Sequence, residues 1–464
     1  MSGRFDLVVL GAGPAGEVAV NAMLKAEKRV ALVERELIGG ECTNWGCIPS
    51  KTLLHPPELR GVSARTAGTK PVELDFGALA EYRDWMVSYH DDTKAAERYR
   101  ERGATVVKGD GRLDGPGRVV VGDEVLETDA VLVATGADAV IPPIPGLAEA
   151  GYWTNREVTA LSELPRSVVF IGGGVVSVEL GQFLARFGVP VTIVQGPDRI
   201  ANREEPHVSS LLEAALREDG IDVVLGRRAT AVEVRGDERV VILDDGAEVA
   251  GERLVVATGR RARTEGYGLE TVGIEPGPRG IVVDERCRAA DGVWAVGDAT
   301  GLAMFTHVAK YQARIACADV LGEPARVDLR AVPRVLFTDP EVASVGITEA
   351  QAREEGRNVA AATIELRSSV SRAFTYERDP KGELGVVVDV DEQVLLGAWA
   401  VAPLASEWIH VAVLAIRARV PLDILGDTIA QFPTFTEGLG VALRRLPQPG
   451  ARSSATETTP VMRP

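Results

Sequence analysis

The strongest constraint on the fold is one supersecondary pattern that occurs twice in the 464-residue chain. A short apolar strand at 5–10 leads into a glycine-rich turn, an Ala/Val-rich helix and a second strand that ends at Glu34. The same order returns as a strand at 167–171, a turn, a helix through 179–187 and a strand that ends at Gln195. Units of this kind bind dinucleotides. The repetition predicts an α/β protein with two Rossmann-like dinucleotide-binding domains.

Each turn carries the small residues that a dinucleotide site needs. They are Gly11, Gly13 and Gly16 in the first copy and Gly172, Gly174 and Ser177 in the second. Small residues permit a tight turn and a close approach of the backbone to a pyrophosphate, which then faces the positive end of the next helix. Glu34 is placed to accept hydrogen bonds from an adenosine ribose. Because strand, helix and acid accompany the glycines, we prefer a binding turn to a purely structural one.

Two cysteines follow the first copy, in the run GGECTNWGCIPSK at 39–51. Cys42 and Cys47 can reach disulfide distance where a chain turns into a helix, and Pro49 suits the first turn of that helix. A helix N-terminus and the charge of Lys51 favour the thiolate, which is the redox-active form. Two buried thiols or a structural disulfide would explain the run equally well by itself. The dinucleotide sites favour a redox-active pair, because they supply a source of electrons.

The segment after the cysteines is expected to be irregular at 56–75 and then to form one long amphipathic helix at 75–102. A small β region follows from about 106, and an apolar strand at 130–136 ends on the sequence Ala-Thr-Gly. A second Ala-Thr-Gly run follows the second dinucleotide unit at 257–259. His90 falls on the long helix, and we expect its side chain to be solvated.

The last third of the chain changes in character. A strand at 293–298 ends on an acid, and from 332 a region of strands at 361–366, 384–390 and 393–400 begins. Helices are expected at 406–418 and 436–446. The final residues are rich in Pro, Ser and Thr and poor in apolar side chains, so we expect a disordered tail.

Composition excludes several classes of protein. A net charge of −16 argues against nucleic acid and anionic membranes as main partners. The chain has four cysteines, which do not form a secreted disulfide framework, and we expect Cys287 and Cys317 to be core residues. There is no apolar run of the roughly 18 residues that a membrane span needs and no spacing typical of metal ligands. Because an apolar strand starts at residue 5, we also expect no signal peptide. We therefore expect a cytoplasmic protein.

The cysteine run resembles the signature of the class I pyridine nucleotide–disulfide oxidoreductases, which include dihydrolipoamide dehydrogenase, glutathione reductase and mercuric reductase. The resemblance extends from about residue 5 to about 445. It implies FAD in the first dinucleotide site, NAD(P)H in the second, and a homodimer formed through a C-terminal α+β dimerisation domain. The implied parts are an FAD-binding domain at 1–150, an NAD(P)-binding domain at 151–285, a return segment of the FAD-binding domain at 286–331, an interface domain at 332–446 and a tail at 447–464.

The resemblance also implies roles for individual residues. Cys47 is the thiol that faces the flavin, Cys42 attacks the substrate, and Lys51 and Glu179 form an ion pair beside the flavin and the nicotinamide. Asp298 holds the ribityl chain. The other positions implied for FAD are Gly11, Gly13, Gly16, Glu34, Arg35, Gly40, Thr43, Gly111, Ala134, Thr135, Gly136, Gly297, Phe305 and Thr306. Those implied for NAD(P) are Gly172, Gly174, Val175, Ser177, Gln195, Arg199 and Gly259.

The C-terminal region departs from the family pattern. Most disulfide reductases of the family carry His-Pro-x-x-x-Glu, in which the His serves as the base for the partner subunit's cysteines. Here Phe432 takes the place of the His while Glu437 is kept, so the proton shuttle is absent. Mercuric reductases have Tyr at this position, but they also carry a C-terminal cysteine pair, and the last cysteine here is Cys317. Mercuric ion is therefore a doubtful substrate.

Two departures concern the nicotinamide nucleotide. Gln195 replaces the Glu of NAD-specific members, and with Arg199 nearby in the sequence this slightly favours NADPH over NADH. Val175 replaces the Tyr lid of glutathione reductase, which leaves the nicotinamide pocket more open.

These features predict an FAD-dependent NAD(P)H oxidoreductase that passes electrons through Cys42 and Cys47 to a non-standard disulfide or small-molecule substrate. Two alternatives stay open. A quinone or dye reductase, or a transhydrogenase, would react directly at the flavin. A redox-sensing flavoprotein subunit would show little turnover.

Overall fold

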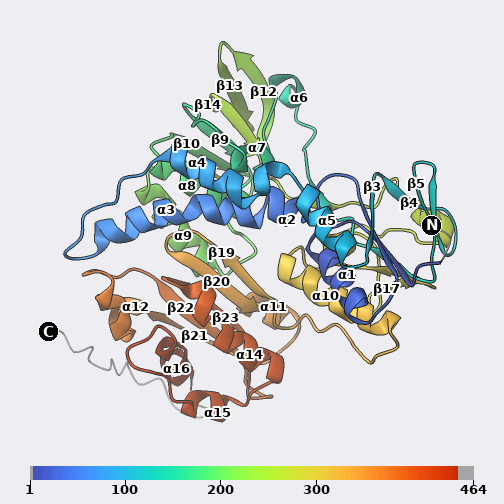
Figure 1. The fold of residues 1–464 in the computed structure, drawn as a ribbon. Helices are drawn as coiled ribbons and strands as arrows, with labels where there is room; N and C mark the ends of the chain where they lie inside the picture. Colours follow the sequence, from blue (N-terminus) through green and yellow to red (C-terminus); the bar gives the residue numbers. More distant parts are fainter. Residues whose placement is uncertain (1–3, 448–464) are drawn as a thin grey trace.

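A computed structural model describes residues 4–447, and Figure 1 draws its fold. The strands of the first dinucleotide unit lie in a six-stranded sheet with the order β17-β18-β7-β1-β2-β3. Its strands are β1 Leu7–Leu10, β2 Val30–Glu34, β3 Thr105–Lys108, β7 Val131–Val133, β17 Arg288–Ala290 and β18 Val293–Ala295. All but β17 pair in parallel. Every residue of β1 and β2 is buried, as expected for a parallel sheet covered on both faces.

Two helices cover one face of this sheet and a small antiparallel sheet covers the other. The helices are α1 (Pro14–Lys25) and α10 (Thr306–Val320), whose alanines share one apolar cluster with the strands. The small sheet consists of β4 Gly111–Leu113, β5 Arg118–Val121 and β6 Glu124–Glu127. Strands β17 and β18 and helix α10, which follow the second unit in the sequence, thus complete the first domain.

The second unit repeats this arrangement with four parallel strands in the order β11-β10-β9-β15. They are β9 Val168–Ile171, β10 Val191–Gln195, β11 Asp222–Leu225 and β15 Arg253–Val256. Helices α8 (Val175–Arg186) and α9 (Pro206–Glu218) pack on one face. The antiparallel strands β12 Ala229–Arg235, β13 Glu238–Leu243 and β14 Glu248–Gly251 pack on the other.

The C-terminal region is an antiparallel five-stranded sheet with helices, in orange and red in Figure 1. Its strands are β19 Pro333–Leu336, β20 Glu341–Gly346, β21 Val359–Glu365, β22 Glu383–Asp389 and β23 Val394–Ala402. Its helices are α11 Glu349–Glu354, α12 Leu366–Ser369, η4 Ser371–Thr375, α13 Ala405–Trp408, α14 His410–Ala418, α15 Leu422–Asp427 and α16 Glu437–Arg444. The predicted fold class, two Rossmann-like domains with a C-terminal α+β region, is thus confirmed.

Short elements join these bodies. They are β8 Ala137–Ala139, α6 Leu147–Ala150, α7 Asn155–Thr159, β16 Arg260–Ala262, η2 Leu269–Val272 and η3 Gly297–Thr300. Strands β8 and β16 pair with each other, so the chain crosses between the two dinucleotide domains as a two-stranded ribbon. No helix within residues 4–447 combines the length and the apolar character needed to cross a membrane. The tail predicted from 447 onward lies outside the described residues except for residue 447 itself.

The helices of the cysteine region and of the segment after it differ from the sequence prediction in two places. They are α2 Gly40–Asn44, α3 Cys47–Arg65, α4 Phe76–Met86, η1 Ser88–His90 and α5 Thr93–Glu101. The irregular segment expected at 56–75 is wrong in its first half, because α3 continues to Arg65 through two prolines. Buried leucines and Pro57 hold that helix against its neighbours, and tertiary packing overrides local propensity.

The single helix expected at 75–102 is also wrong, because it breaks between α4 and α5. Arg83 of α4 is 1% exposed and donates hydrogen bonds to the carbonyl oxygens of Thr159 and Leu161. Asp92, just before α5, accepts from the backbone N–H of Ile38 and from Lys108. The two halves are thus fastened to different parts of the molecule, and the backbone between them turns away from the helical path.

Candidate active site

A cleft of about 1090 Å³ opens where the carboxyl ends of the first sheet meet α3, α8 and the C-terminal domain. Eighteen of the residues predicted for the site line it: Gly11, Gly13, Glu34, Arg35, Gly40, Cys42, Cys47, Lys51, Gly111, Ala134, Thr135, Gly136, Val175, Glu179, Gly297, Asp298, Phe305 and Thr306. The structure therefore brings the first glycine turn, the cysteine pair and the start of α10 together around one space.

The first glycine of each turn is required by close backbone packing. A side chain at Gly11 would collide with the carbonyl of Ala134, and one at Gly172 would collide with the carbonyl of Ala257. Both glycines also have positive φ, 105° and 106°. The two Ala-Thr-Gly runs thus occupy the same position relative to their turns, which is the internal repeat seen in three dimensions.

The second glycine of each turn faces open space. No atom lies within 4 Å of a Cβ built on Gly13 or Gly174. These residues begin α1 and α8, whose first N–H groups have no partners within the helix. Anionic phosphate groups suit such a cradle, so the residues present fit two dinucleotides.

The polar residue at the end of each second strand braces its own turn. Glu34 accepts a hydrogen bond from the Ala12 N–H at 2.7 Å, and Gln195 accepts one from the Gly173 N–H at 2.7 Å. The amide of Gln195 also donates to the carbonyl of Arg199 at 3.1 Å. Gln195 therefore matches Glu34 in position while presenting no negative charge.

Cys42 and Cys47 form an asymmetric pair at the junction of α2 and α3. The Cys42 thiol donates to Cys47, and this bond, helped by the Thr306 hydroxyl and the charge of Lys51, lowers the pKa of Cys47 to about 6. The same bond and burial raise the pKa of Cys42. The Cys47 sulfur lies 3.4 Å from the Thr306 oxygen at the start of α10. Both shifts favour Cys47 as the thiolate of the pair and Cys42 as the protonated thiol.

Lys51 and Glu179 join the cysteine helix to the second dinucleotide domain. Their side chains form an ion pair of 2.8 Å between α3 and α8, as the family resemblance implied. Glu179 is 3% exposed and also accepts a hydrogen bond from the backbone N–H of Phe337 at 2.8 Å. The Lys51 ammonium lies 4.8 Å from the centre of the Phe337 ring. The pair therefore fixes the position of α8 relative to α3.

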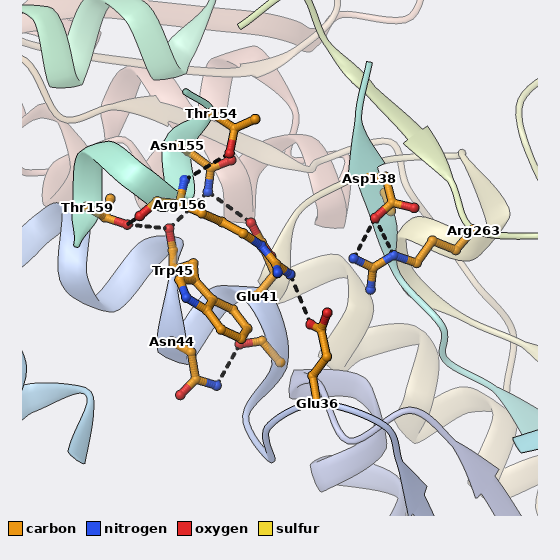
Figure 2. Close-up of polar contacts among 12 residues, drawn as sticks. Glu36, Glu41, Asn44, Trp45, Asp138, Thr154, Asn155, Arg156, Thr159 and Arg263 are labelled. Carbon is orange, nitrogen blue, oxygen red and sulfur yellow. Dashed lines mark hydrogen bonds and ion pairs between the residues drawn. The ribbon is translucent and has the colours of Figure 1, made fainter. Parts of the chain in front are cut away.

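The sequence prediction missed a polar network beside Cys42, shown in Figure 2. Arg156 of α7 binds Glu41 at 2.7 Å and Glu36 at 3.1 Å, and its guanidinium lies 4.0 Å from the centre of the Trp45 ring. Asn155 donates to Glu41 at 2.9 Å. Burial acts to raise the pKa of Glu41, but Arg260, Asn155 and Arg156 outweigh it and hold the pKa below its usual range. No spacing rule links these residues, because more than 100 positions separate Arg156 from Glu41.

Asp298 lies at the cleft end of β18, where the sequence predicted an acid. Its nearest cation is Arg260, at 3.9 Å, and Arg260 also approaches Glu41 at 3.6 Å. Burial raises the pKa of Asp298, and Arg260 opposes that rise. Arg260 thus offsets part of the cost of burying the Asp298 carboxylate, whose oxygens can still accept hydrogen bonds.

Two histidines also line the cleft, His307 of α10 and His410 of α14. Burial lowers the pKa of His307, a bond to the Pro333 backbone opposes this, and the charge of His410 adds to the lowering. His307 stacks on Phe305 with ring centres 5.3 Å apart. Residues 4–447 contain no cluster of His, Cys, Asp and Glu that could hold a metal ion.

Ten predicted site residues do not line the cleft: Gly16, Thr43, Gly172, Gly174, Ser177, Gln195, Arg199, Gly259, Phe432 and Glu437. Gly172, Gly174, Ser177, Gln195 and Gly259 instead surround the second turn, where the Ser177 hydroxyl donates to the Gly172 carbonyl. Phe432 is 72% exposed and lies in the C-terminal domain, where Glu437 accepts from the Thr434 N–H. A role for Phe432 and Glu437 therefore requires a second copy of the chain and stays a prediction.

The two remaining cysteines lie where the sequence predicted, but His90 does not. Cys287 and Cys317 are buried, at 0% and 2% exposure, as predicted for core residues. His90 is not simply solvated as expected: its ring stacks on Trp45 and its Nε2 lies 3.0 Å from the Asn44 carbonyl. This difference follows from the break between α4 and α5, which redirects the side chain toward the cysteine loop.

Comparison with known proteins gives two family matches. Residues 5–313 match the pyridine nucleotide-disulphide oxidoreductase model, and residues 332–443 match the dimerisation domain of the same proteins. The mercuric reductase of Staphylococcus aureus is 32% identical over 95% of this chain and 82% of its own length. The dihydrolipoyl dehydrogenase of Thermus scotoductus is 33% identical over 95% of this chain and 97% of its own length.

Solved structures with the same fold include two bacterial proteins. The HOCl-induced flavoprotein disulfide reductase RclA from Escherichia coli, in its Cu(II) complex, has a TM-score of 0.83 and 29% identity, covering 96% of this chain and 99% of RclA. LpdA from Mycobacterium tuberculosis has a TM-score of 0.84 and 29% identity, covering 95% of this chain and 99% of LpdA. The likeness therefore extends over both dinucleotide domains and the C-terminal domain.

Proposed function

The chain belongs to the pyridine nucleotide-disulphide oxidoreductases, and from this membership we propose an enzyme that uses Cys42 and Cys47 to reduce a non-standard disulfide or another small acceptor. Members of the family are FAD-dependent enzymes that take electrons from a pyridine nucleotide. FAD and the nicotinamide supply hydride and electron-pair transfer when bound, and the chain positions them. The observation that carries the proposal is the asymmetry of the two cysteines in the cleft: the Cys47 sulfur lies 3.4 Å from the Thr306 oxygen and its pKa is lowered to about 6, while the pKa of Cys42 is raised.

The roles of the two sulfurs are those that the family resemblance implies, and Cys42 must pass its proton to a base before its sulfur can attack. Cys47, beside Thr306 and at the start of α3, is proposed as the cofactor-facing thiolate, and Cys42 as the sulfur that attacks a substrate disulfide. Exchange would pass through a mixed disulfide on Cys42, which Cys47 then resolves. Two electrons and the Cys42 proton leave the pair, and one further proton comes from solvent, as two substrate thiols form.

The proton balance limits the acceptor. The first substrate sulfur leaves as a thiolate that needs a proton, and Phe432 offers none at the position where related reductases have His. We therefore propose that ordinary lipoamide and glutathione disulfide are poor acceptors. A better substrate brings its own acid or has a leaving sulfur of low pKa. An aromatic group on the substrate would also stack on Phe432.

The second candidate is a quinone or dye reductase that reacts directly at the flavin. It is favoured by Val175, which is 44% exposed at the start of α8 and leaves access to the cleft. Such an acceptor needs neither cysteine nor a base at position 432.

An acceptor screen tests both candidates. Steady-state rates with disulfides and with quinones are measured for the wild type, Cys42→Ser and Phe432→His. The disulfide proposal expects activity that Cys42→Ser abolishes, with lipoamide or glutathione turnover increased in Phe432→His. If Cys42→Ser keeps the quinone rates of the wild type, and the wild type reduces no disulfide, the protein is the second candidate, a quinone or dye reductase. Lipoamide turnover of about 10 s⁻¹ or more by the wild type would contradict the argument from the missing base.

Three finer features belong to the same proposal. The dimerisation domain supports a homodimer in which Phe432 and Glu437 approach the partner's cysteines. Gln195 and Arg199 support a slight preference for NADPH. A cytoplasmic location, expected from the small number of cysteines, stays a prediction.

A further inference from the structure

Three consecutive residues between α4 and α5 adopt the left-handed backbone conformation. Ser88, Tyr89 and His90 have φ values of 53°, 54° and 55°, and none of them is Gly, Asn or Asp. Each residue of this kind costs about 1–2 kcal/mol relative to the right-handed region. Three in a row are therefore kept only where the surrounding structure holds them and where the turn serves a purpose.

The turn is held from both ends. On one side, the buried Arg83 fastens α4 to the carbonyls of Thr159 and Leu161. On the other side, Asp92 binds the Ile38 N–H at 2.8 Å and Lys108 at 2.7 Å. Within the turn, the His90 N–H donates to the Val87 carbonyl and the Asp91 N–H donates to the Ser88 carbonyl.

The turn places the His90 side chain against the loop between the two cysteines. The Nε2 of His90 lies 3.0 Å from the Asn44 carbonyl oxygen, which has no proton, so Nε2–H is the donor. The imidazole also stacks on Trp45, with ring centres 5.5 Å apart and planes inclined by 18°. Asn44 is 5% exposed, so this contact lies on the inner side of the cysteine loop.

The next carbonyl of the loop is held from α7. The Trp45 carbonyl oxygen accepts from the Asn155 amide at 3.0 Å and from the Thr159 hydroxyl at 3.1 Å. Figure 2 shows these contacts together with Arg156 over the Trp45 ring. Two successive carbonyls of the four-residue loop are thus held, one by His90 and one by α7.

We propose that His90 is a positioning residue for the redox pair: its hydrogen bond to the Asn44 carbonyl and its stacking on Trp45 stabilise the dithiol form of the Cys42–Cys47 loop. The contacts belong to the dithiol form, because both cysteines are free in this structure. Under this proposal, these contacts weaken when the sulfur–sulfur bond draws the ends of the loop together, and removal of a contact that is stronger in one form shifts the equilibrium toward the other form. Loss of the His90 contacts therefore favours the disulfide. This inference rests on the proposed redox role of the two cysteines.

The test is a redox titration of the FAD-loaded full-length protein in dithiothreitol buffers. Oxidised dithiothreitol accepts two electrons from the Cys42 thiol and the Cys47 thiolate, together with the Cys42 proton and one proton from the buffer, as the sulfur–sulfur bond forms. Acid quenching, alkylation and mass spectrometry give the fraction of disulfide. FAD content and the thermal unfolding midpoint show that each variant is folded.

Three variants separate positioning from general structure. His90→Phe keeps an aromatic ring against Trp45 but loses the donor, and His90→Gln restores an N–H of similar reach. His55→Phe is the matched control, since the His55 side chain is 65% exposed on α3 and contacts only Glu58 among described partners.

The expected result is a shift toward disulfide of about tenfold for His90→Phe, the size of one hydrogen bond, which corresponds to a midpoint potential about 30 mV more negative. His90→Gln should lie close to the wild type, and His55→Phe should equal it. An unchanged equilibrium in a folded His90→Phe overturns the inference but leaves the redox role intact. A wild type that forms no Cys42–Cys47 disulfide overturns both. If His90→Phe does not fold, the dithiol–disulfide equilibrium of His90→Gln is compared with that of His90→Asn, whose shorter side chain cannot reach the Asn44 carbonyl. A shift toward disulfide in His90→Asn alone supports the inference, and equal equilibria overturn it.

Discussion

Lys51 and Glu179 lie 128 positions apart in the sequence, yet their charged groups meet at 2.8 Å and join the cysteine helix to the second dinucleotide domain. The pair is asymmetric in its environment, because the Glu179 side chain is 4% exposed and that of Lys51 is 34% exposed. A buried carboxylate needs its partner more than the partly exposed ammonium does.

Lys51→Met should therefore destabilise the protein by about 1–3 kcal/mol, since it leaves the Glu179 carboxylate with only the Phe337 N–H as donor. The double variant Lys51→Met with Glu179→Leu should recover part of this loss. Chemical denaturation of the two single variants and the double variant measures the coupling. Additive losses in the double variant would contradict the interpretation.

The thiolate of Cys47 predicts a pH-dependent absorbance. After two-electron reduction, the FAD-loaded protein should show a long-wavelength thiolate–flavin charge-transfer band that is present above pH 6 and lost as the pH falls through about 6, because the depressed pKa keeps Cys47 ionised above that value. Lys51→Met should move the midpoint upward, since the Lys51 charge helps to lower this pKa.

The two cysteines should differ in this spectrum. Cys42→Ser should show the band without reductant, because Cys47 then has no disulfide partner and the serine hydroxyl can still donate to it. Cys47→Ser should lose the band. Equal spectra for the two variants would refute the assignment of Cys47 as the cofactor-facing sulfur.

Gln195 predicts weak discrimination between NADH and NADPH. It carries no charge, and its side chain is occupied by the Gly173 N–H and the Arg199 carbonyl. Gln195→Glu should shift the preference toward NADH by about 1–2 kcal/mol, the scale of one unfavourable charge contact with a 2′-phosphate. The measurement is the ratio of kcat/KM for the two nucleotides. A wild-type ratio above about a hundredfold, or roughly 2.7 kcal/mol, would refute the prediction.

The left-handed turn makes a prediction about stability that is independent of His90. Tyr89 is 64% exposed, so its side chain contributes little packing. Tyr89→Gly should be neutral or stabilising by up to about 1 kcal/mol, since glycine adopts this conformation freely but loses more entropy on folding. Tyr89→Val should destabilise, because β-branched side chains tolerate positive φ poorly. A lower thermal unfolding midpoint for Tyr89→Gly than for Tyr89→Val would contradict the role of backbone strain.

Local patterns in the sequence predicted most of the site. The glycine turns, the cysteine run and the Ala-Thr-Gly runs were recognised because their function depends on spacing within a few residues, and the structure brings the lining members of the first turn and the cysteines to one cleft. The ion pair of Lys51 and Glu179 was reached only through resemblance to the family, since nothing local connects two residues in different domains.

The residues that escaped prediction act across long stretches of chain. Arg156 and Glu41 are 115 positions apart, and His90 and Asn44 are 46 apart. The amphipathic pattern at 75–102 was correctly read as helical, but the pattern contains no sign of the break at 88–90, where Ser, Tyr and His occupy positions that usually take glycine.

The sequence by itself thus determined the two dinucleotide units, the redox cysteine motif and the loss of the family's histidine at Phe432, because each depends on which atoms are present in a short segment. Only the tertiary structure decided how the cysteine loop is held. Arg83 and Asp92 anchor the two sides of the break to separate elements, and the backbone between them accepts an unfavourable conformation because those anchors are stronger than its local preference.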